Sequence, residues 1–562
     1  MPRILVLVLL VAVGAAAPAH AQDKKKRKRD RPPSTVEVQL LGINDFHGHL
    51  EADTPGTVTR RLHPAEVRVP AGGAEYLATH IRALKRRNPN TLVVAAGDLV
   101  GASPMLSSLF HDEPTIEALN AIGLDVSAVG NHEFDEGPAE LLRLKRGGCH
   151  PRDGCRDGNG YRGADFAFLA ANVTSVRTGR TLFPPYVIKR IGGVRIGFIG
   201  MTLEGTPELL LPIFSNLMHF ADEADTANRY VRELRRKKVR AIVVLLHEGG
   251  APIRRASPDG CPGLSGPLED IINRTSSEVD VFLTGHTHAA YDCVVDRRRV
   301  TSAGSFGRLI TRVTLKVNRR RDDIVRARAD NWVVGQDVMR APDMTKLIAR
   351  YARFADPLRK RVIGRLASYA SRGANRAGER PMGTMTADAE QVATGADAAF
   401  VNPGEVRRGL SAGEVTYGRA FASLPFGSTL VTMTLTGGEV LELLKEQWCG
   451  RSRPRVLQPS SGVSYTWSKQ VADSILDTPC DTAPHPVSAL EIGGEPADTQ
   501  RHYRITVSSR LAGGFNRFDI LEGGIDQVGG PDETAALEGH LSPSVTGDPI
   551  VPPPRSRIAV AP

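Results

Sequence analysis

Residues 36–48 read VEVQLLGINDFHG, an apolar run that ends in a cluster of polar side chains. A short run rich in Val, Leu and Ile that stops at polar residues is typical of a buried β-strand. Asp45 and His47 stand two residues apart at its end, so an extended segment would point both side chains the same way. We therefore expect a strand with two candidate metal ligands at its carboxyl end.

The same pattern recurs along the first half of the chain. Four further apolar runs end in polar side chains: residues 91–96 before Asp98, 127–129 before Asn131 and His132, 241–246 before His247, and 279–283 before His286 and His288. Helical patterns lie between the runs, for example at residues 74–87 and 222–237. Because ligands bind outside the carboxyl ends of strands in α/β sheets, we expect one site built from all these strand ends.

The chemistry of this site follows from its ligand types. Carboxylate, amide and imidazole groups suit Zn, Mn, Fe, Mg or Ca, which the sequence does not distinguish, and they do not suit a thiolate site. A carboxylate at Asp98 could bridge two cations ~3.5–4 Å apart, an arrangement that clamps a phosphate group. Each block alone is typical of a surface turn or of a buried, hydrogen-bonded histidine. The complete set at strand ends is what indicates a metal centre.

The N-terminus has the features of a targeting segment. Arg3 precedes the apolar run 4–17, and Ala19-His20-Ala21 has the small residues that a signal peptidase accepts. We expect a signal peptide at residues 1–21, a basic disordered arm at 22–35, and a protein secreted or held in the periplasmic or cell-envelope space. The apolar run is short for a transmembrane helix, so we expect no transmembrane anchor.

The charge of the 562-residue chain is concentrated at its start. The formal net charge is +10, but eight of the 72 Lys and Arg and two of the 62 Asp and Glu lie in residues 1–34, which leaves 64 basic and 60 acidic residues for the rest. A body so close to neutral predicts no nucleic-acid complex. The basic arm could still make a weak electrostatic contact with an anionic cell envelope.

Six cysteines suggest disulfides in an exported chain. Fifteen pairings are possible, and the simplest joins sequence neighbours: Cys149 with Cys155, Cys261 with Cys293, and Cys449 with Cys480. Structural zinc is the less favoured alternative, because no C-x-x-C spacing occurs.

The remaining segments divide by composition and periodicity. We expect an α/β domain at 36–335, a charged connector helix at 336–366, a second α/β domain at 367–530 and a tail at 531–562. In the second domain the patterns predict helices at residues 386–394 and 438–447 and strands at residues 429–435 and 503–507.

The five blocks together resemble those of the calcineurin-like metallophosphoesterases, in the version found in the 5′-nucleotidase/UDP-sugar hydrolase family. The resemblance covers residues 36–525 and is more specific in the first domain than in the second. It implies a four-layer α/β/β/α domain joined to a smaller α/β substrate-binding domain. It also implies two divalent metal ions, a first held by Asp45, His47, Asp98 and His288 and a second by Asp98, Asn131, His247 and His286. His132 and Asp135 would form a catalytic dyad.

The same resemblance implies where the substrate binds. The matching positions in the second domain are Arg376, Asn402, Arg407, Phe426 and Gly462, together with the block from Gly513 to Asp519. This last block departs from the family's Gly-Gly-Asp-Gly-Phe, so Phe515 and Phe518 both remain candidates for the second ring that stacks on a base, and Asp519 is a further candidate contact. The departure leaves adenosine preference open.

The leading hypothesis is an exported two-metal phosphohydrolase that releases phosphate from nucleoside 5′-phosphates by attack of a metal-activated water. An alternative keeps the chemistry and changes the substrate to UDP-sugars, 2′,3′-cyclic nucleotides, other phosphoesters or exported nucleic acid. An alternative of another class is a non-catalytic surface or interaction protein. The presence of every expected ligand favours the enzyme.

Overall fold

A computed structural model describes residues 33–53, 56–62, 65–210, 212–252, 258–261 and 263–561. The predicted signal peptide and nearly all of the predicted basic arm lie outside these residues. From Thr35 onward the chain forms one unit, in which we distinguish an N-terminal lobe (residues 35–360) and a C-terminal lobe (residues 362–561) by their separate hydrophobic cores.

Two six-stranded sheets form the centre of the N-terminal lobe. The first has the order β18 (Asp323–Val333), β17 (Leu309–Asn318), β1 (Thr35–Ile43), β4 (Thr91–Ala95), β5 (Val126–Ala128), β6 (Ala167–Leu169). The second has the order β15 (Ala290–Val295), β16 (Arg298–Ala303), β14 (Val281–Thr284), β11 (Ala241–His247), β9 (Val194–Thr202), β8 (Tyr186–Ile191). The strands that carry the predicted ligands run parallel within each sheet, β1 with β4 and β5, and β11 with β14.

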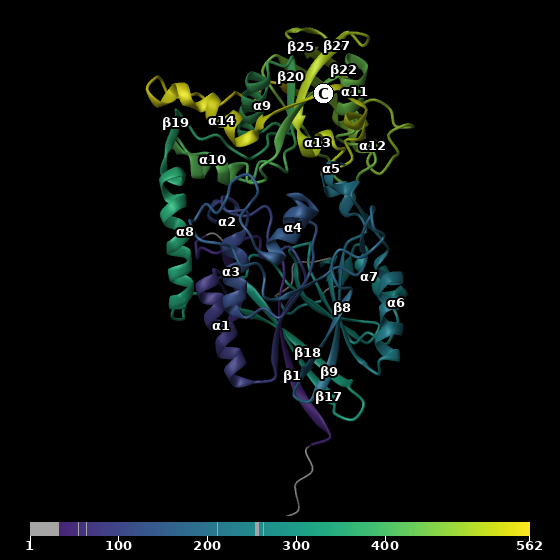
Figure 1. Cartoon of the computed structure of the whole chain (residues 1–562). Helices are drawn as coiled ribbons and strands as arrows, with labels where there is room; N and C mark the ends of the chain where they lie inside the picture. The colour runs from purple at the N-terminus through teal and green to yellow at the C-terminus, as the bar shows by residue number, and fades with distance from the viewer. Residues whose placement is uncertain are drawn as a thin grey trace, which may run out of the picture. The chain divides into compact units, whose positions relative to one another are not determined.

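Helices cover the outer faces of both sheets (Figure 1). One buried cluster, which includes Val38, Val94, Phe198 and Val243, joins the facing sides of the two sheets. Other clusters bury the helices, which are α1 (Ala74–Arg87), α3 (Glu113–Ile122), α4 (Gly137–Arg146) and α8 (Pro342–Lys360) on the first sheet, and α6 (Glu223–Arg236) and α7 (Leu268–Arg274) on the second. The layers are therefore α/β/β/α, as predicted.

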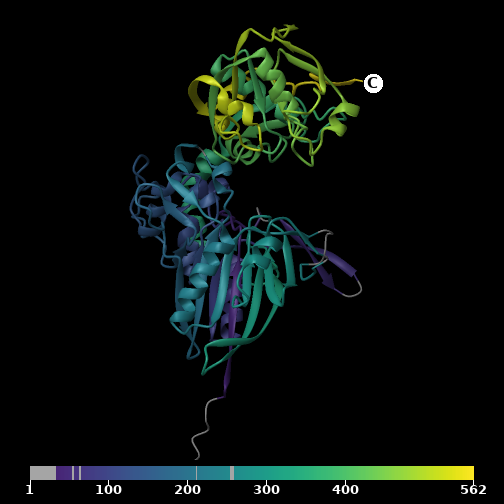
Figure 2. The same cartoon turned by 90° about the vertical axis from the view of Figure 1, so that its right-hand side faces the viewer.

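Smaller elements complete this lobe. The hairpin of β2 (Thr57–Leu62) and β3 (Ala65–Pro70) projects from it (Figure 2). The others are α2 (Met105–Ser108), β7 (Val173–Ser175), α5 (Pro212–Ser215), β10 (Met218–Phe220), β12 (Ala251–Pro252) and β13 (Leu264–Ser265).

The C-terminal lobe is also α/β. Its five-stranded sheet has the order β23 (Gln458–Pro459), β20 (Ala398–Val401), β27 (His502–Ser508), β22 (Thr429–Thr436), β28 (Ile525–Asp532), and a four-stranded sheet has the order β26 (Glu495–Pro496), β25 (Val487–Ile492), β24 (Val463–Ser468), β29 (Ile558–Ala561). Alternate residues of β20 enter two different cores, because successive side chains of a strand point to opposite faces. Helices α9 (Pro381–Thr394), α10 (Tyr417–Ser423) and α14 (Glu533–Leu541) contribute to one core, and α11 (Gly437–Lys445) to the other. The two short strands β19 (Val362–Leu366) and β21 (Gly413–Thr416) pair with each other, and α12 (Lys469–Ser474) and α13 (Ser509–Ala512) are short helices.

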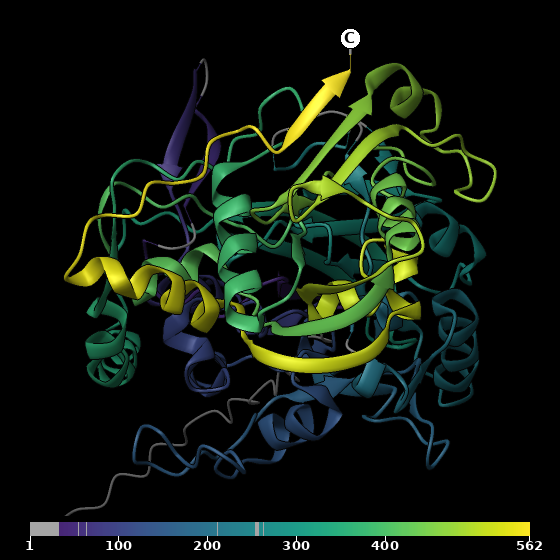
Figure 3. The ribbon, with the colours of Figure 1, turned by 90° about the horizontal axis from the view of Figure 1, so that it is seen from above.

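The predicted connector helix packs on the N-terminal lobe. Helix α8 buries Met344, Tyr351 and Ala355 in the N-terminal core, so the chain passes between the cores at Arg361. The segment expected as a tail forms α14 and β29, and β29 pairs in parallel with β24 (Figure 3). Its short elements have no periodicity of their own, and they are stabilised by packing against the rest of the lobe.

The six cysteines form the three neighbour pairs, Cys149–Cys155, Cys261–Cys293 and Cys449–Cys480, which confirms the simplest of the possible pairings. None of the described helices combines the length and apolar composition that crossing a membrane requires.

Candidate metal centre and active site

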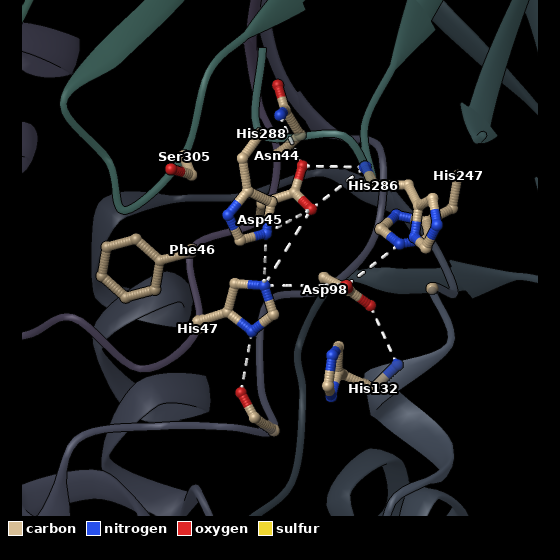
Figure 4. A network of polar contacts seen from close by, with 12 residues as sticks. Asn44, Asp45, Phe46, His47, Asp98, His132, His247, His286, His288 and Ser305 are labelled. Carbon is tan, nitrogen blue, oxygen red and sulfur yellow. Dashed lines mark hydrogen bonds and ion pairs between the residues drawn. The ribbon is translucent and has the colours of Figure 1, made fainter. Parts of the chain in front are cut away.

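The carboxyl ends of β1, β4, β5, β11 and β14 meet at one place, and the predicted ligands converge there (Figure 4). Asp45, Asp98 and His247 are at most 1% exposed, and His47 and Asn131 are 2% and 3% exposed. Parallel neighbours in a sheet end at the same edge, so residues that are distant in sequence become neighbours in space.

Asp45, His47 and His288 form the first ligand group. His47 Nε2 lies 3.1 Å from His288 Nε2, and His288 Nε2 lies 3.3 Å from Asp45 Oδ1. The other ring nitrogen of His47, Nδ1, is 2.8 Å from the Gly101 carbonyl oxygen. When Nδ1 carries the proton and donates to that oxygen, the Nε2 lone pair is directed at the other two ligand atoms.

His247, His286 and Asn131 form the second group. The Asn131 Oδ1 lies 3.1 Å from His247 Nε2 and 3.0 Å from His286 Nδ1. Asp98 joins the two groups, because its Oδ2 lies 3.0 Å from His247 Nε2 and 3.6 Å from His47 Nε2. The donor set of buried carboxylates, one amide oxygen and imidazoles fits divalent cations.

His132 and Asp135 form a hydrogen-bonded pair beside this centre. His132 Nδ1 lies 2.7 Å from Asp135 Oδ2, and the backbone N–H of His132 donates to Asp98 Oδ1 at 2.9 Å. An imidazole held on one side by a carboxylate presents its other nitrogen to the cavity, which suits a group that donates a proton or stabilises negative charge.

Two supporting residues were not among the predicted site residues. Glu133 accepts hydrogen bonds from the backbone N–H groups of Asp98, Leu99 and Gly130 at 3.0, 2.7 and 2.6 Å. Asn44 donates to Asp45 Oδ2 at 2.6 Å and accepts from the backbone N–H of Ala303 at 2.8 Å. Both residues belong to the sequence motifs from which the ligands were predicted, so their position in these motifs was the one signal that could have identified them.

The electrostatics of the centre follow from burial and close charges. Burial lowers the pKa of both His47 and His286 to about 4, which keeps these imidazoles neutral, as metal ligands must be. Burial also opposes charge on His247, but the Asp98 carboxylate outweighs it and raises that pKa to about 10. A cation bound beside His247 would therefore compete with that proton. Burial also opposes a positive charge on His132, but the carboxylates of Asp135 and Asp98 favour that charge more strongly and raise the pKa of His132.

A cavity of about 660 Å³ lies beside the centre. His47, His132 and His288 line it from the N-terminal lobe, and the C-terminal lobe contributes aromatic rings and guanidinium groups. These are Phe421, Phe426, Phe515, Arg372, Arg407, Arg408, Arg455 and Arg510. Anionic, ring-bearing molecules match this combination of guanidinium and aromatic groups.

Three of the predicted substrate residues line the cavity, namely Arg407, Phe426 and Phe515. The structure places the other five elsewhere. Arg376, Gly462 and Asp519 are exposed at the surface and do not line it. Asn402 is fully buried and accepts the backbone N–H of Gly404, and Phe518 is fully buried in the C-terminal core. Of the two candidate rings, Phe515 is therefore the one available to a ligand.

Arg510 contacts both available rings. Its guanidinium carbon is 4.9 Å from the centroid of Phe426 and 5.1 Å from that of Phe515. A guanidinium over an aromatic face is attracted by the ring quadrupole. Sequence patterns do not reveal this arrangement, because it depends on how β27, α13 and the loop before β22 pack together.

Two family models match the chain. Calcineurin-like phosphoesterase matches residues 38–290, and the 5′-nucleotidase C-terminal domain matches residues 362–523. Among curated relatives, Endonuclease YhcR of Bacillus subtilis is 32% identical over 79% of this chain and 35% of its own length. Cell wall protein Lmo0130 of Listeria monocytogenes is 30% identical over 87% of this chain and 64% of its own length. The chain thus spans about a third of the length of the first relative and about two thirds of the length of the second.

The fold is shared with solved structures. A 5′-nucleotidase precursor from Thermus thermophilus has a TM-score of 0.69 at 24% identity, covering 93% of this chain and 99% of its own. A putative 5′-nucleotidase from Staphylococcus aureus also has a TM-score of 0.69, at 18% identity, covering 93% of this chain and 100% of its own. At this identity the likeness establishes the architecture of the two lobes.

Proposed function

Because the chain belongs to the calcineurin-like phosphoesterases that carry a 5′-nucleotidase C-terminal domain, we propose that it uses two divalent cations to release phosphate from nucleoside 5′-phosphates. The family supports a metal-dependent phosphoric-ester hydrolase over a non-catalytic surface protein. Our proposal adds to the family assignment the number of cations, two, and the substrate, a nucleoside 5′-phosphate.

One observation supports two cations above the rest. Asp98 Oδ2 lies within 3.6 Å of a ligand nitrogen in each of the two groups, so a single carboxylate can bridge a pair of ions. Asp45, His47 and His288 would hold the first ion with Asp98, and Asn131, His247 and His286 would hold the second. When bound, such a pair acidifies a water molecule and stabilises charge on a phosphoryl group.

The chain's own residues position and protonate the substrate. With Nδ1–H donated to Asp135, His132 keeps Nε2 directed away from the carboxylate, where it can give a proton to a leaving alkoxide or stabilise charge on the phosphoryl group. Arg407 lies with its guanidinium carbon 5.7 Å from the Phe426 centroid and offers donors to a phosphate. Glu133 holds the backbone on which Asp98 and Gly130 stand, and so positions the bridging ligand.

The test is phosphate release from AMP, UMP, UDP-glucose, 2′,3′-cyclic AMP and p-nitrophenyl phosphate, with Mn, Zn, Mg or Ca and with EDTA. We expect release from the monophosphates, loss with EDTA, loss in Asp98→Asn, and a kcat lowered by about 10²–10⁴-fold in His132→Ala. His219→Ala, an exposed histidine on β10, is the matched control and should keep full activity. Release from no monophosphate with any metal would contradict the proposal.

A second candidate substrate is the phosphodiester of a nucleic acid. The guanidinium groups of Arg372, Arg407, Arg408, Arg455 and Arg510 line the cavity, and of these Arg510 also interacts with the carboxyls of Glu405 and Glu533. A group of guanidiniums favours a ligand with several phosphates. Cleavage of a single-stranded oligonucleotide faster than of AMP, with a steep dependence on salt, would favour this candidate.

We also propose that the protein is exported. The disulfides are typical of oxidising compartments. One relative carries the name of a cell wall protein. Fractionation of cells that produce the full chain should recover it outside the cytoplasm with its N-terminal segment removed, and recovery of the intact chain in the cytosol would contradict export.

A further inference from the structure

A second cluster of metal-ligating side chains lies outside the centre described above. His111 follows α2, Glu136 immediately precedes α4, and His150 and Asp153 belong to the loop that the Cys149–Cys155 disulfide closes. We call these four residues the His111 cluster. It draws on three segments that are separate in sequence.

The distances within the His111 cluster are short. His111 Nδ1 lies 2.8 Å from Glu136 Oε2, and His111 Nε2 lies 2.8 Å from Asp153 Oδ2. His150 stacks on His111 with ring centroids 3.7 Å apart, and its Nδ1 is 3.7 Å from Asp153 Oδ2. His111, His150 and Asp153 each offer one ligand atom within 4.8 Å of the others.

We propose that His111, His150 and Asp153 bind one further divalent transition-metal ion, of the zinc class, separate from the ions of the catalytic centre. Two imidazoles and a carboxylate are a ligand set that Zn²⁺ takes readily, with water completing the coordination. The proposal concerns binding, and it stands whether or not nucleotides are the substrate.

Glu136 supplies the supporting contact that such a site needs. A histidine that binds a metal usually donates its other N–H to a carboxylate, which fixes the tautomer and the ring orientation. Here Glu136 Oε2 is placed to accept Nδ1–H of His111, which leaves the Nε2 lone pair directed at Asp153. The neighbouring Glu140 is already held by Arg143, so it is not counted as a ligand.

The Cys149–Cys155 disulfide closes the loop that carries the other two ligands. The backbone N–H of Asp153 donates to His150 Nδ1 at 3.2 Å, and this hydrogen bond is given up when His150 binds the ion. Arg156 Nη2 lies 2.9 Å from Asp153 Oδ2, the same oxygen that His111 Nε2 contacts, so a bound ion would take Oδ1 or displace the guanidinium. The side chains of His111 and His150 are each 15% exposed, so an ion can reach them.

The bound ion would stiffen a loop next to the catalytic centre. His111 and Asp112 both have positive φ angles, 51° and 60°, a conformation that is strained for residues other than glycine. Asp112 Oδ2 accepts the backbone N–H of Gly101 at 2.9 Å, and the Gly101 carbonyl contacts His47 Nδ1. His111 is therefore linked to the predicted metal ligand His47 through its neighbour Asp112 and two hydrogen bonds of Gly101.

The competing explanation is a protonated His111 held between two carboxylates. Burial opposes this charge, yet Glu136 and Asp153 outweigh burial and raise the pKa of His111. That explanation predicts no metal at the His111 cluster, so the experiment separates the two.

The experiment counts ions in the oxidised full-length protein. Protein stripped with chelator is reloaded with Zn²⁺ and desalted, and bound zinc is measured by mass spectrometry for the wild type, His150→Ala and Asp153→Asn. We expect each variant to bind one ion fewer than the wild type, while His502→Ala, an exposed histidine at the start of β27, binds as many. Equal zinc content in the wild type and both variants would overturn the proposal.

A second readout identifies the ligands and controls for misfolding. With Co²⁺ in place of Zn²⁺, the wild type minus Asp153→Asn difference spectrum should show a visible absorption band from the lost site, and the far-UV circular dichroism of the two proteins should coincide. A flat difference spectrum from folded protein would likewise overturn the proposal. Phosphate release does not enter either readout, so failure of the proposed function and failure of this inference are distinguishable.

Discussion

The backbone of the candidate metal centre is strained at the predicted ligands. Asp45, His47, Asp98, His286 and His288 have positive φ angles between 46° and 69°. Non-glycine residues adopt this conformation at a cost of about 1–3 kcal/mol each, and such residues cluster at functional sites. Gly97, with φ of 86°, lies so close to Gly130 and His247 that a Cβ would meet their atoms at 2.6 and 2.7 Å. Packing of the two sheets therefore holds the ligands in place.

Arg510 is the residue at which substrate preference can be tested. Its guanidinium carbon lies 4.9 Å from the Phe426 centroid and 5.1 Å from the Phe515 centroid, so a base that stacks on either ring competes with the guanidinium for that ring. Each cation–π contact is worth about 0.5–1 kcal/mol, and stacking a base gains about 1–3 kcal/mol. We expect Arg510→Ala to lower the KM for AMP by about three- to tenfold.

The control for this prediction is a substrate without a base. The KM for methyl phosphate should stay the same or rise in Arg510→Ala, because that substrate gains no stacking. A KM for AMP that rises together with that for methyl phosphate would show instead that Arg510 binds phosphate.

At the scale of elements, Asp280 tests how the second sheet is held together. It stands just before β14, and its Oδ2 accepts the backbone N–H of Ile242 in β11 at 3.0 Å. Burial raises the pKa of Asp280 to about 7, above its usual value of 3.8. The folded protein therefore keeps this proton between pH 4 and 7 while the unfolded chain has lost it, and the free energy of unfolding falls as the pH rises through that range.

We expect Asp280→Asn to stabilise the protein in a pH-dependent way. An amide accepts the same hydrogen bond and does not ionise, so the free energy of unfolding of the variant should rise relative to that of the wild type by roughly 2 kcal/mol between pH 4 and pH 7, allowing for solvent screening. Denaturant unfolding at several pH values measures the difference. Glu269→Gln, an exposed site on α7, is the control, and a difference independent of pH in Asp280→Asn would refute the assignment.

At the scale of the whole molecule, the two lobes have separate hydrophobic cores. Helix α8 contributes to the N-terminal clusters only, and the Cys449–Cys480 disulfide lies in the C-terminal core. We expect calorimetry to show two unfolding transitions, and the double variant Cys449→Ala/Cys480→Ala to destabilise one of them by about 3 kcal/mol. The transition of the N-terminal lobe is the internal control. A single transition that shifts as a whole would show that the lobes unfold together.

The ligands were predicted from sequence because each one lies at a strand end: His247 is the last residue of β11, and the others follow shortly after their strands. Asp45 and His47 come after β1, and His286 and His288 after β14, so local patterns were sufficient to predict that they share one edge. The disulfides were predictable for a related reason: each joins cysteines at most 32 residues apart, which local structure brings together. Supporting residues such as Glu133 were visible in the motifs, but their hydrogen bonds were not.

By itself the sequence determined an α/β fold and the family it resembles, and it predicted the metal ligands and favoured the disulfide pairs, since all of these depend on strand ends and local motifs. Only the tertiary structure decided that Phe515 lines the cavity while Phe518 lies in the core, and that Arg510 contacts both Phe426 and Phe515. It also brought His111 to the disulfide loop of His150 and Asp153. These arrangements join segments that no local pattern connects, so they exist only once the chain has packed.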